Sequence, residues 1–219
     1  MSALAPGKKI YFISDFHLGI PDREKSLERE KKIVRWLDSI RHDAQVLFLM
    51  GDVFDYWFEY SEAVPKGYVR LLGKLAELSD SGIELHYFTG NHDMWVFDYF
   101  TQEMGIQIHR DTIVKEYNGK SFFLGHGDGL GPSDHGYKLI KSVFANPACQ
   151  WLFARIHPNT GIRIMKFSPE KVVWPRAVMT ASLRERKTNG LYSFVKTSWP
   201  GSTSIFSSSD TGICPSISH

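Results

Sequence analysis

Four short polar motifs hold the side chains of this sequence that are best suited to bind metal ions. They are S-D-F-H at residues 14–17, G-D-V-F-D at 51–55, G-N-H-D at 90–93 and G-H-G-D at 125–128. Each follows a run of mainly apolar residues. Carboxylate, amide and imidazole groups are costly to bury without partners, so their recurrence after apolar runs predicts one shared site. A single motif of this kind is equally typical of a turn or a helix N-cap, but four in this order favour the site.

The types of these side chains indicate the chemistry. Asp15 and His17 stand two residues apart in an extended segment, so both can point to the same side. Carboxylate, amide oxygen and imidazole together suit Mn²⁺, Fe²⁺ or Zn²⁺ better than Ca²⁺. Two cations about 3.5–4 Å apart need a shared ligand, and Asp52 can bridge them. Such a pair lowers the pKa of a bound water and screens the charge of a phosphate, so attack at phosphorus needs no protein nucleophile.

The G-N-H-D motif adds two candidate catalytic residues. His92, next to Asn91, can donate a hydrogen bond to a phosphate oxygen or to the leaving group and so stabilise the charge of the transition state. Asp93 is expected to orient His92 as a neighbouring carboxylate. As a structural alternative, Asp93 is also typical of a helix N-cap.

A layered α/β fold is predicted to carry these motifs. Residues 9–14, 44–50 and 83–88 are short apolar runs of the kind that form strands covered on both faces. The other expected elements are helices at 24–41, 66–81 and 93–104, and a hairpin of residues 112–117 and 120–124 about Asn118-Gly119. In open α/β sheets, ligands bind beyond the carboxyl ends of the strands. We therefore expect the four motifs to meet at that edge.

In this order, the motifs resemble those of the calcineurin-like metallophosphoesterase superfamily. A narrower resemblance, to the bacterial UDP-2,3-diacylglucosamine diphosphatases, covers residues 8–167 and rests on FISDFHLG, GDVFDYW and HGDGLGPSDHGYKLIKSVFANPACQWLF. It implies a four-layer αββα sandwich with a helical insertion. It also implies hydrolysis of the pyrophosphate bond of UDP-2,3-diacylglucosamine to UMP and 2,3-diacylglucosamine 1-phosphate, a step of lipid A biosynthesis.

The resemblance further implies which residues hold two divalent metal ions, with Mn²⁺ as the expected metal. Asp15, His17 and Asp52 serve one ion in this assignment, and Asp52 also serves the other ion. The remaining ligands of that second ion are Asn91 and His126.

Two departures from the family pattern stand out. Many members of the narrower family carry arginine where this chain has His92. The family also closes its site with a late G-H-x-H motif, which gives one histidine to each metal. That motif is absent here, since the histidines after His126 are His135, His157 and His219. His157 is expected in a loop or at a helix end, so five of the expected seven ligands are present.

Three regions are predicted along the chain: a metallophosphoesterase core at 1–131, a helical insertion or lid at 132–170 and an atypical tail at 171–219. The insertion is rich in aromatic and basic residues, which predicts a small helical core or an apolar, basic-rimmed surface for a lipid-like ligand. By the resemblance, Asp134 and Lys138 contact substrate there. The end of the tail is close to half Ser and Thr, which is typical of disorder. A truncated gene or a lost reading frame would give the same pattern, with the fold incomplete at its C-terminus.

Composition limits the partners. The 219 residues carry a formal net charge of only +2, which does not argue for nucleic acid. Two distant cysteines indicate a reducing compartment. No secretory signal is expected from the N-terminal residues, and no apolar run approaches the roughly 20 residues that span a bilayer. The expectation is a cytoplasmic enzyme, peripheral on the inner membrane, with a lipid-linked nucleotide as substrate and no evident protein partner.

Two alternatives remain open on the sequence. In the first, the chain is a calcineurin-like phosphodiesterase or phosphatase for a soluble nucleotide or a phosphoprotein, for which an apolar, basic insertion has little use. In the second, it is an inactive remnant or a binding module with incomplete metal sites.

Overall fold

The computed structural model describes residues 3–127, 142–167 and 203–206. The chain divides into two compact units, one of Met1–His126 with Ile205–His219 and the other of Gly127–Ser204. The predicted substrate contacts Asp134 and Lys138 lie outside the described residues, as does the predicted tail except for residues 203–206. The predicted three-region division stays a prediction.

A four-stranded parallel sheet forms the centre of the first unit. Its strands, in the order in which they pair, are β1 (Lys9–Ile13), β2 (Ala44–Leu49), β3 (Glu84–Phe88) and β4 (Gln107–His109). The first three confirm the predicted strands. The fourth was not predicted, because its three residues give no readable period between a helix and the hairpin.

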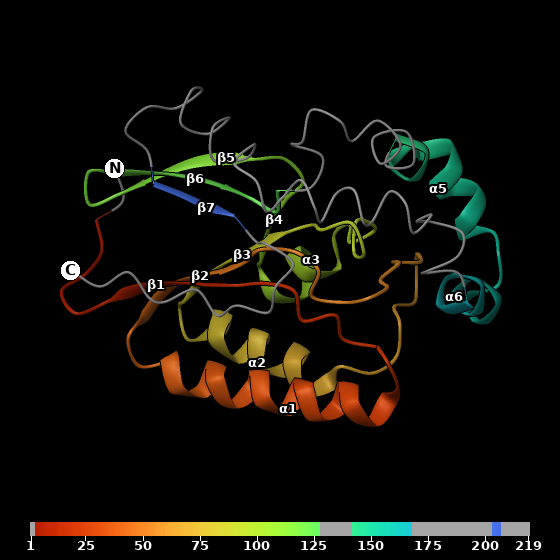
Figure 1. The fold of residues 1–219 in the computed structure, drawn as a ribbon, viewed down its shortest axis with the longest axis horizontal. Coiled ribbons are helices and arrows are strands. Elements are labelled where there is room, and N and C mark those ends of the chain that lie inside the picture. The colour runs from red at the N-terminus through yellow and green to blue at the C-terminus, as the bar shows by residue number, and fades with distance from the viewer. Residues whose placement is uncertain (1–2, 128–141, 168–202, 207–219) are drawn as a thin grey trace, which may run out of the picture. The chain divides into compact units, whose positions relative to one another are not determined.

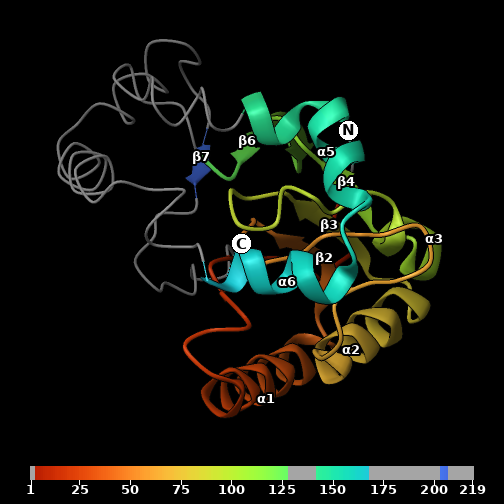
Figure 2. The same cartoon turned by 90° about the vertical axis from the view of Figure 1, so that its right-hand side faces the viewer.

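Helices α1 (Arg23–Ile40) and α2 (Val69–Asp80) join these strands and cover one face of the sheet, as Figures 1 and 2 show. Both were predicted from their apolar spacing. The Asp22 side chain caps α1 by accepting a hydrogen bond from the Lys25 N–H. Their buried faces pack on the sheet through side chains such as Leu37, Leu71 and Leu75, each fully buried. Because every crossover helix of the parallel sheet lies on one side, the other face is left for a second layer.

The second layer is an antiparallel hairpin of β5 (Ile113–Tyr117) and β6 (Lys120–Gly125), with β7 (Thr203–Phe206) beside β6. Asn118 and Gly119 form its turn with φ of 50° and 73°, as the sequence predicts for a type I′ turn. Strand β7 was not predicted, since the tail shows no period of two. Apolar residues fill the space between the two sheets: Ile10, Phe12, Val46, Phe48, Met50, Phe88, Tyr117, Phe122 and Leu124.

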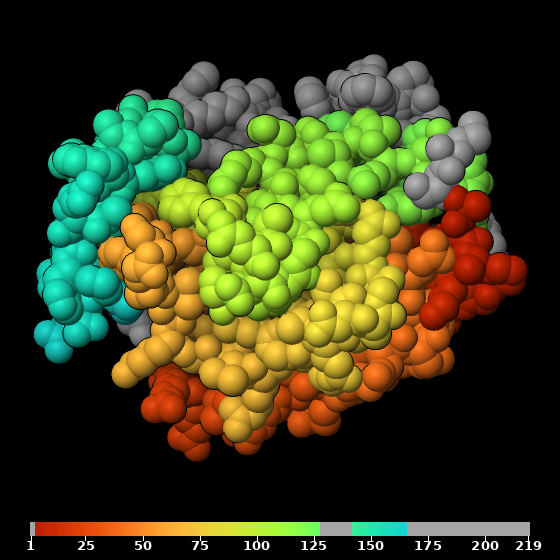
Figure 3. Space-filling model, turned by 180° about the vertical axis from the view of Figure 1, so that it is seen from behind, coloured from red at the N-terminus to blue at the C-terminus, as the bar shows by residue number. Residues whose placement is uncertain are grey.

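Three layers of the predicted sandwich are therefore present: helices, parallel sheet and hairpin sheet. Among the described residues of this unit, no helix covers the outer face of the hairpin sheet. The N-terminal residues lie beside the hairpin turn, where the Leu4 N–H donates to Asn118 Oδ1 at 3.0 Å. Figure 3 shows these red residues next to the green end of the hairpin.

The predicted helix at 93–104 is wrong at its start. Helix α3 covers only Tyr99–Met104. The carboxylate of Glu59, 8% exposed, accepts hydrogen bonds from the N–H groups of Phe97, Asp98 and Tyr99 at 2.7, 2.8 and 3.2 Å. A buried carboxylate at this point satisfies the free N–H groups of a helix that begins at 99, whereas residues 93–98 take part in the loop beyond β3.

The second unit contains helices α5 (Pro147–Ala154) and α6 (Pro158–Phe167), which confirm helical structure in this part of the predicted insertion. The side chains of Trp151 and Leu152 are 57% and 61% exposed. The Arg155 guanidinium lies over the Trp151 ring, 4.7 Å from its centre. Of the helices in the described ranges, none is long and apolar enough to cross a membrane.

The capping role of Glu59 gives a test. Glu59→Gln should lower the free energy of unfolding by about 2 kcal/mol, because an amide removes the charge that three N–H groups face. Asp98→Ala is the matched control: Asp98 holds the N-cap position but makes no side-chain capping bond. Its cost should stay below about 1 kcal/mol. Chemical denaturation measures both, and equal losses would contradict the assignment.

Candidate metal centre

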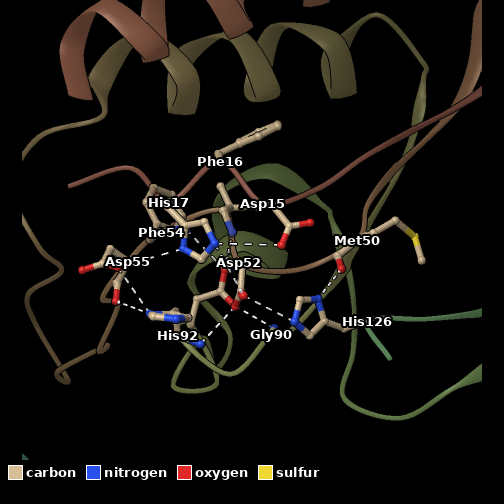
Figure 4. A network of polar contacts seen from close by, with 12 residues as sticks. Asp15, Phe16, His17, Met50, Asp52, Phe54, Asp55, Gly90, His92 and His126 are labelled. Atoms are coloured by element: carbon tan, nitrogen blue, oxygen red, sulfur yellow. Dashed lines mark hydrogen bonds and ion pairs between the residues drawn. The ribbon is translucent and has the colours of Figure 1, made fainter. Parts of the chain in front are cut away.

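The carboxyl ends of two parallel strands and the end of the hairpin bring four of the five predicted ligands together. Asp15 and His17 follow β1, Asp52 follows β2 and His126 follows β6. Figure 4 shows the Asp52 carboxylate in the middle of this group, with the three imidazole rings of His17, His92 and His126 around it. Four separate segments thus deliver side chains to one place, as the sequence predicted.

Asp52 occupies the position that a shared ligand needs. Its Oδ2 lies 3.4 Å from His126 Nε2 and 3.9 Å from His17 Nε2. Its Oδ1 accepts a hydrogen bond from the His92 N–H at 3.0 Å, which fixes the carboxylate. Burial alone would raise the pKa of Asp52, but the imidazoles of His126, His92 and His17 outweigh it and hold that pKa well below its usual range. The residue is therefore an anion although it is only 4% exposed.

His17 has the features of a metal ligand. Its Nε2 lies 3.9 Å from Asp15 Oδ1, too far for a hydrogen bond. Its Nδ1 is buried and has no hydrogen-bond partner among the described residues, with Asp55 Oδ1 4.0 Å away. Burial lowers the pKa of His17, with a smaller contribution from His92 and opposition from Asp52, so the ring is neutral near pH 7. A neutral imidazole facing two carboxylates fits a divalent cation.

His126 is held in the tautomer that a ligand requires. Its Nδ1 lies 2.8 Å from the carbonyl oxygen of Met50, which can only accept, so Nδ1 donates. A His126 ring that gave up its Nε2 proton to a metal would therefore present its lone pair from Nε2, the atom that faces Asp52. A hydrogen bond from the far nitrogen to a backbone carbonyl is the usual way in which proteins orient metal-binding histidines.

The backbone at three of these candidate ligands is strained. Asp15, His17 and Asp52 have φ values of 57°, 43° and 53°, in the left-handed region that non-glycine residues seldom adopt. Hydrogen bonds between the two loops hold this conformation: the Asp15 N–H donates to the Gly51 carbonyl at 3.1 Å and the His17 N–H to the Asp52 carbonyl at 2.9 Å. Strain of this kind persists only where the surrounding structure enforces it, and it gathers at functional sites.

A comparison of the sequence with protein-family models decides the family. The model described as calcineurin-like phosphoesterase matches residues 8–179. The chain belongs to the calcineurin-like phosphoesterase family.

Two relatives by sequence are named as hydrolases. The chain is 47% identical over 152 residues to a UDP-2,3-diacylglucosamine hydrolase of Porphyromonas gingivalis, which covers 69% of this chain and 58% of that protein. It is 32% identical over 138 residues to one of Nitrosococcus oceani, covering 63% and 53%. The chain thus spans little more than half the length of these relatives. Among solved structures, Yfce, a phosphoesterase from E. coli, matches with 25% identity and a TM-score of 0.33, over 57% of this chain and 60% of that one.

In the calcineurin-like phosphoesterase motif G-N-H-D, the contacts of His92 and Asp93 differ from those predicted. The ring of His92 faces Asp55, with Nδ1 3.2 Å from the Asp55 carbonyl oxygen and 3.4 Å from Oδ1. Burial opposes the charged ring, but these contacts with Asp55 and the charge of Asp52 raise the pKa of His92 to about 9. The carboxylate next to His92 is therefore Asp55 in the structure, although Asp93 was expected to orient it. The sequence feature that could have predicted the pairing of His92 with Asp55 is the second aspartate of G-D-V-F-D, which is Asp55.

Asp93 instead links the loops that follow β2 and β3. It is fully buried and accepts hydrogen bonds from the N–H groups of Gly90 and Val53, at 2.7 and 2.8 Å, and from the Tyr87 hydroxyl at 2.5 Å. Burial, with a further contribution from the charge of Asp52, raises its pKa to about 6. Asn91 is half-buried in the same loop, between Gly90 and His92.

Two glycines of the family motifs were not predicted as functional residues, yet the site depends on them. A Cβ at Gly90 would stand 2.1 Å from Asp52 Oδ1, and one at Gly51 would stand 2.4 Å from His126 Nδ1. Gly51 also has a φ of 99°. Both lie where two loop backbones approach closely, so each leaves the space that the ligands occupy.

Of the three histidines after His126, His157 was expected in a loop or at a helix end, and the structure describes it. His157 is exposed and immediately precedes α6, and its Nδ1 accepts a hydrogen bond from the Asn159 N–H at 3.3 Å. This confirms it as a helix-end residue. His135 and His219 lie outside the described residues.

The close approach at Gly90 gives a second test. Gly90→Ala should displace the Asp52 carboxylate, weaken Mn²⁺ binding at least tenfold and lower the free energy of unfolding by about 1–3 kcal/mol. Gly73→Ala is the control, since a Cβ there meets nothing within 4 Å. As a helix-interior change it should raise stability by about 0.5–1 kcal/mol and leave Mn²⁺ binding unchanged. Metal titration and chemical denaturation of both variants measure this, and normal Mn²⁺ binding by Gly90→Ala would contradict it.

Proposed function

We propose that this chain carries the site of a two-metal hydrolase that cleaves the pyrophosphate bond of UDP-2,3-diacylglucosamine, giving UMP and 2,3-diacylglucosamine 1-phosphate for lipid A biosynthesis. The chemistry is supported above all by the position of Asp52 Oδ2 between the Nε2 atoms of His17 and His126. The substrate class is supported by the relatives, which are named for it.

The donor set fits two divalent ions, with Mn²⁺ as the proposed metal. Asp15, His17 and Asp52 would hold one ion, and Asp52 would also contribute to the other together with Asn91 and His126. Two such ions supply an activated water and neutralise the charge of the pyrophosphate. Oxygen and imidazole donors without thiolate, as here, match this class of metal.

His92 is proposed to donate a hydrogen bond to a phosphate oxygen or to the leaving UMP. Its pKa of about 9 keeps the ring protonated near pH 7, so it offers a positive charge where negative charge develops. Asp55 orients this ring through its contacts with Nδ1. Asp93 supports catalysis by fixing the loop that carries His92.

The second unit is proposed to receive the acyl chains. Exposed Trp151 and Leu152, with Arg155 beside them, combine apolar surface and positive charge, which suits a lipid with a phosphate group. Asp134 and Lys138 are proposed to contact the substrate at the start of this insertion. An amphiphilic substrate of this kind places the enzyme at the cytoplasmic surface of the inner membrane.

The absence of the G-H-x-H motif lowers the rate of hydrolysis that we expect. Each ion would have one imidazole fewer, so the five identified residues would give each ion three protein ligands, with Asp52 shared. We expect Mn²⁺ to bind weakly and turnover of UDP-2,3-diacylglucosamine by this chain to be slow, because the bound ions must position both water and substrate. Robust turnover at micromolar Mn²⁺ would contradict this expectation.

UMP release from UDP-2,3-diacylglucosamine, followed against Mn²⁺ concentration, tests the function. Activity should rise with Mn²⁺, and Asp52→Asn should lose at least 100-fold, because it affects both ions. Asp80→Asn, an exposed change at the end of α2, should match the unchanged chain. Hydrolysis of bis-p-nitrophenyl phosphate without UMP release would favour the soluble-substrate alternative. Failure to bind Mn²⁺ would overturn the proposal.

A further inference from the structure

The loop between β1 and α1 carries His17 and is held by one side chain from the helix. Nη1 of Arg29 donates hydrogen bonds to the carbonyl oxygens of Phe16, His17 and Ile20, at 3.0, 2.7 and 3.4 Å. The shortest of the three is to the carbonyl of His17 itself. A single cationic nitrogen thus gathers three carbonyl groups of the loop, and such charge-assisted bonds are stronger than neutral ones.

A second side chain on the same face of α1 also bonds to this loop. Ser26 lies three residues before Arg29, on the same side of α1, and its Oγ accepts a hydrogen bond from the Gly19 N–H at 2.8 Å. From the other side, the Tyr68 hydroxyl donates to the Leu18 carbonyl at 3.2 Å. The backbone of the loop is therefore bonded to side chains of α1 and to Tyr68, and the side chain that bonds to the His17 carbonyl is Arg29.

The hydrogen bond to the His17 carbonyl helps to fix the orientation of the His17 imidazole ring. With φ at 43°, His17 is in a conformation that its own backbone does not favour. Its N–H is fixed by the Asp52 carbonyl at 2.9 Å, and its carbonyl by Arg29 at 2.7 Å. With both flanking peptide groups held, the direction of the Cα–Cβ bond is set, and this directs Nε2 toward Asp15 and Asp52.

We propose that Arg29 is a positioning residue for the metal ligand His17. It is not one of the proposed ligands, and acts by stabilising the strained backbone from which the imidazole projects. The inference rests on the proposed function, because it requires His17 to bind a metal. Partners of ligands that lie one contact further from a metal typically contribute 10–100-fold to metal affinity.

The next residue of α1 provides a contrast. Glu30 is buried, and its Oε1 accepts hydrogen bonds from the N–H groups of Arg70 and Leu71 at 2.9 and 3.1 Å, at the start of α2. It links the two helices and, among the described residues, forms no hydrogen bond with the loop of His17. Loss of Glu30 should therefore destabilise the fold without a specific effect on the metal, which separates a structural from a positioning role.

The experiment is a titration of the metal-free full chain with Mn²⁺, with free Mn²⁺ followed by electron paramagnetic resonance, together with thermal unfolding. Arg29→Met should weaken the binding of at least one Mn²⁺ by about 10–100-fold. Arg29→Lys should recover most of this loss, because one ammonium nitrogen has three N–H groups for the three carbonyls. Arg35→Met removes an exposed charge from the same helix and should bind Mn²⁺ like the unchanged chain. Glu30→Gln should lower the unfolding temperature but keep Mn²⁺ affinity.

The outcomes separate the two proposals. If the unchanged chain binds Mn²⁺ and Arg29→Met binds it equally well, Arg29 has no positioning role and the proposed function stands. If Arg29→Met and Glu30→Gln lose affinity to the same degree, the effect is general destabilisation and the positioning role is again refuted. If Arg29→Met does not fold, the Mn²⁺ affinity of Arg29→Lys is compared with that of Arg35→Met. Equal affinity, or a loss of less than twofold, supports the positioning role. A loss as large as that of His17→Ala refutes it. If the unchanged chain binds no Mn²⁺, the proposed function fails and this inference with it.

Discussion

The charge of Asp52 is the constraint on which the rest of the site depends. A carboxylate that is almost fully removed from water is stable only if neighbouring groups replace the water. Here the replacements are the His92 N–H on one oxygen and the imidazoles of His126 and His17 near the other. Each of these belongs to a different loop, so the demand of one buried anion fixes the relative positions of four segments.

The strained backbone follows from the same constraint. The loops after β1 and β2 must turn sharply to aim Asp15, His17 and Asp52 at one point, and left-handed conformations provide that turn. Gly51 and Gly90 let the loops approach until their backbones nearly touch. Asp93 then binds the loops from inside, through N–H groups that a buried turn would otherwise leave unsatisfied. The site is thus a set of short loops kept rigid by mutual hydrogen bonds.

Sequence patterns predicted the strands and the meeting of the polar motifs because both depend on local regularities. Apolar runs give strands, and a polar residue directly after a run lies at the carboxyl end of its strand. The orienting partner of His92 was not predicted correctly, because Asp55 lies 37 residues away along the chain and is brought near only by the sheet. The start of α3 was missed for the same reason, since the capping Glu59 comes from another loop. Long-range pairings of this kind leave no periodic signal in the residues that they join.

The hairpin that carries His126 belongs to a different sheet from the strands that carry Asp15 and Asp52. The apolar layer between the two sheets is non-directional and would tolerate small sliding of one sheet over the other. An ion held by Asp52 and His126 would act as a cross-link at one end of that layer and remove this freedom. Metal binding would then be linked to folding, and the ion would contribute to the cohesion of the two sheets as well as to chemistry.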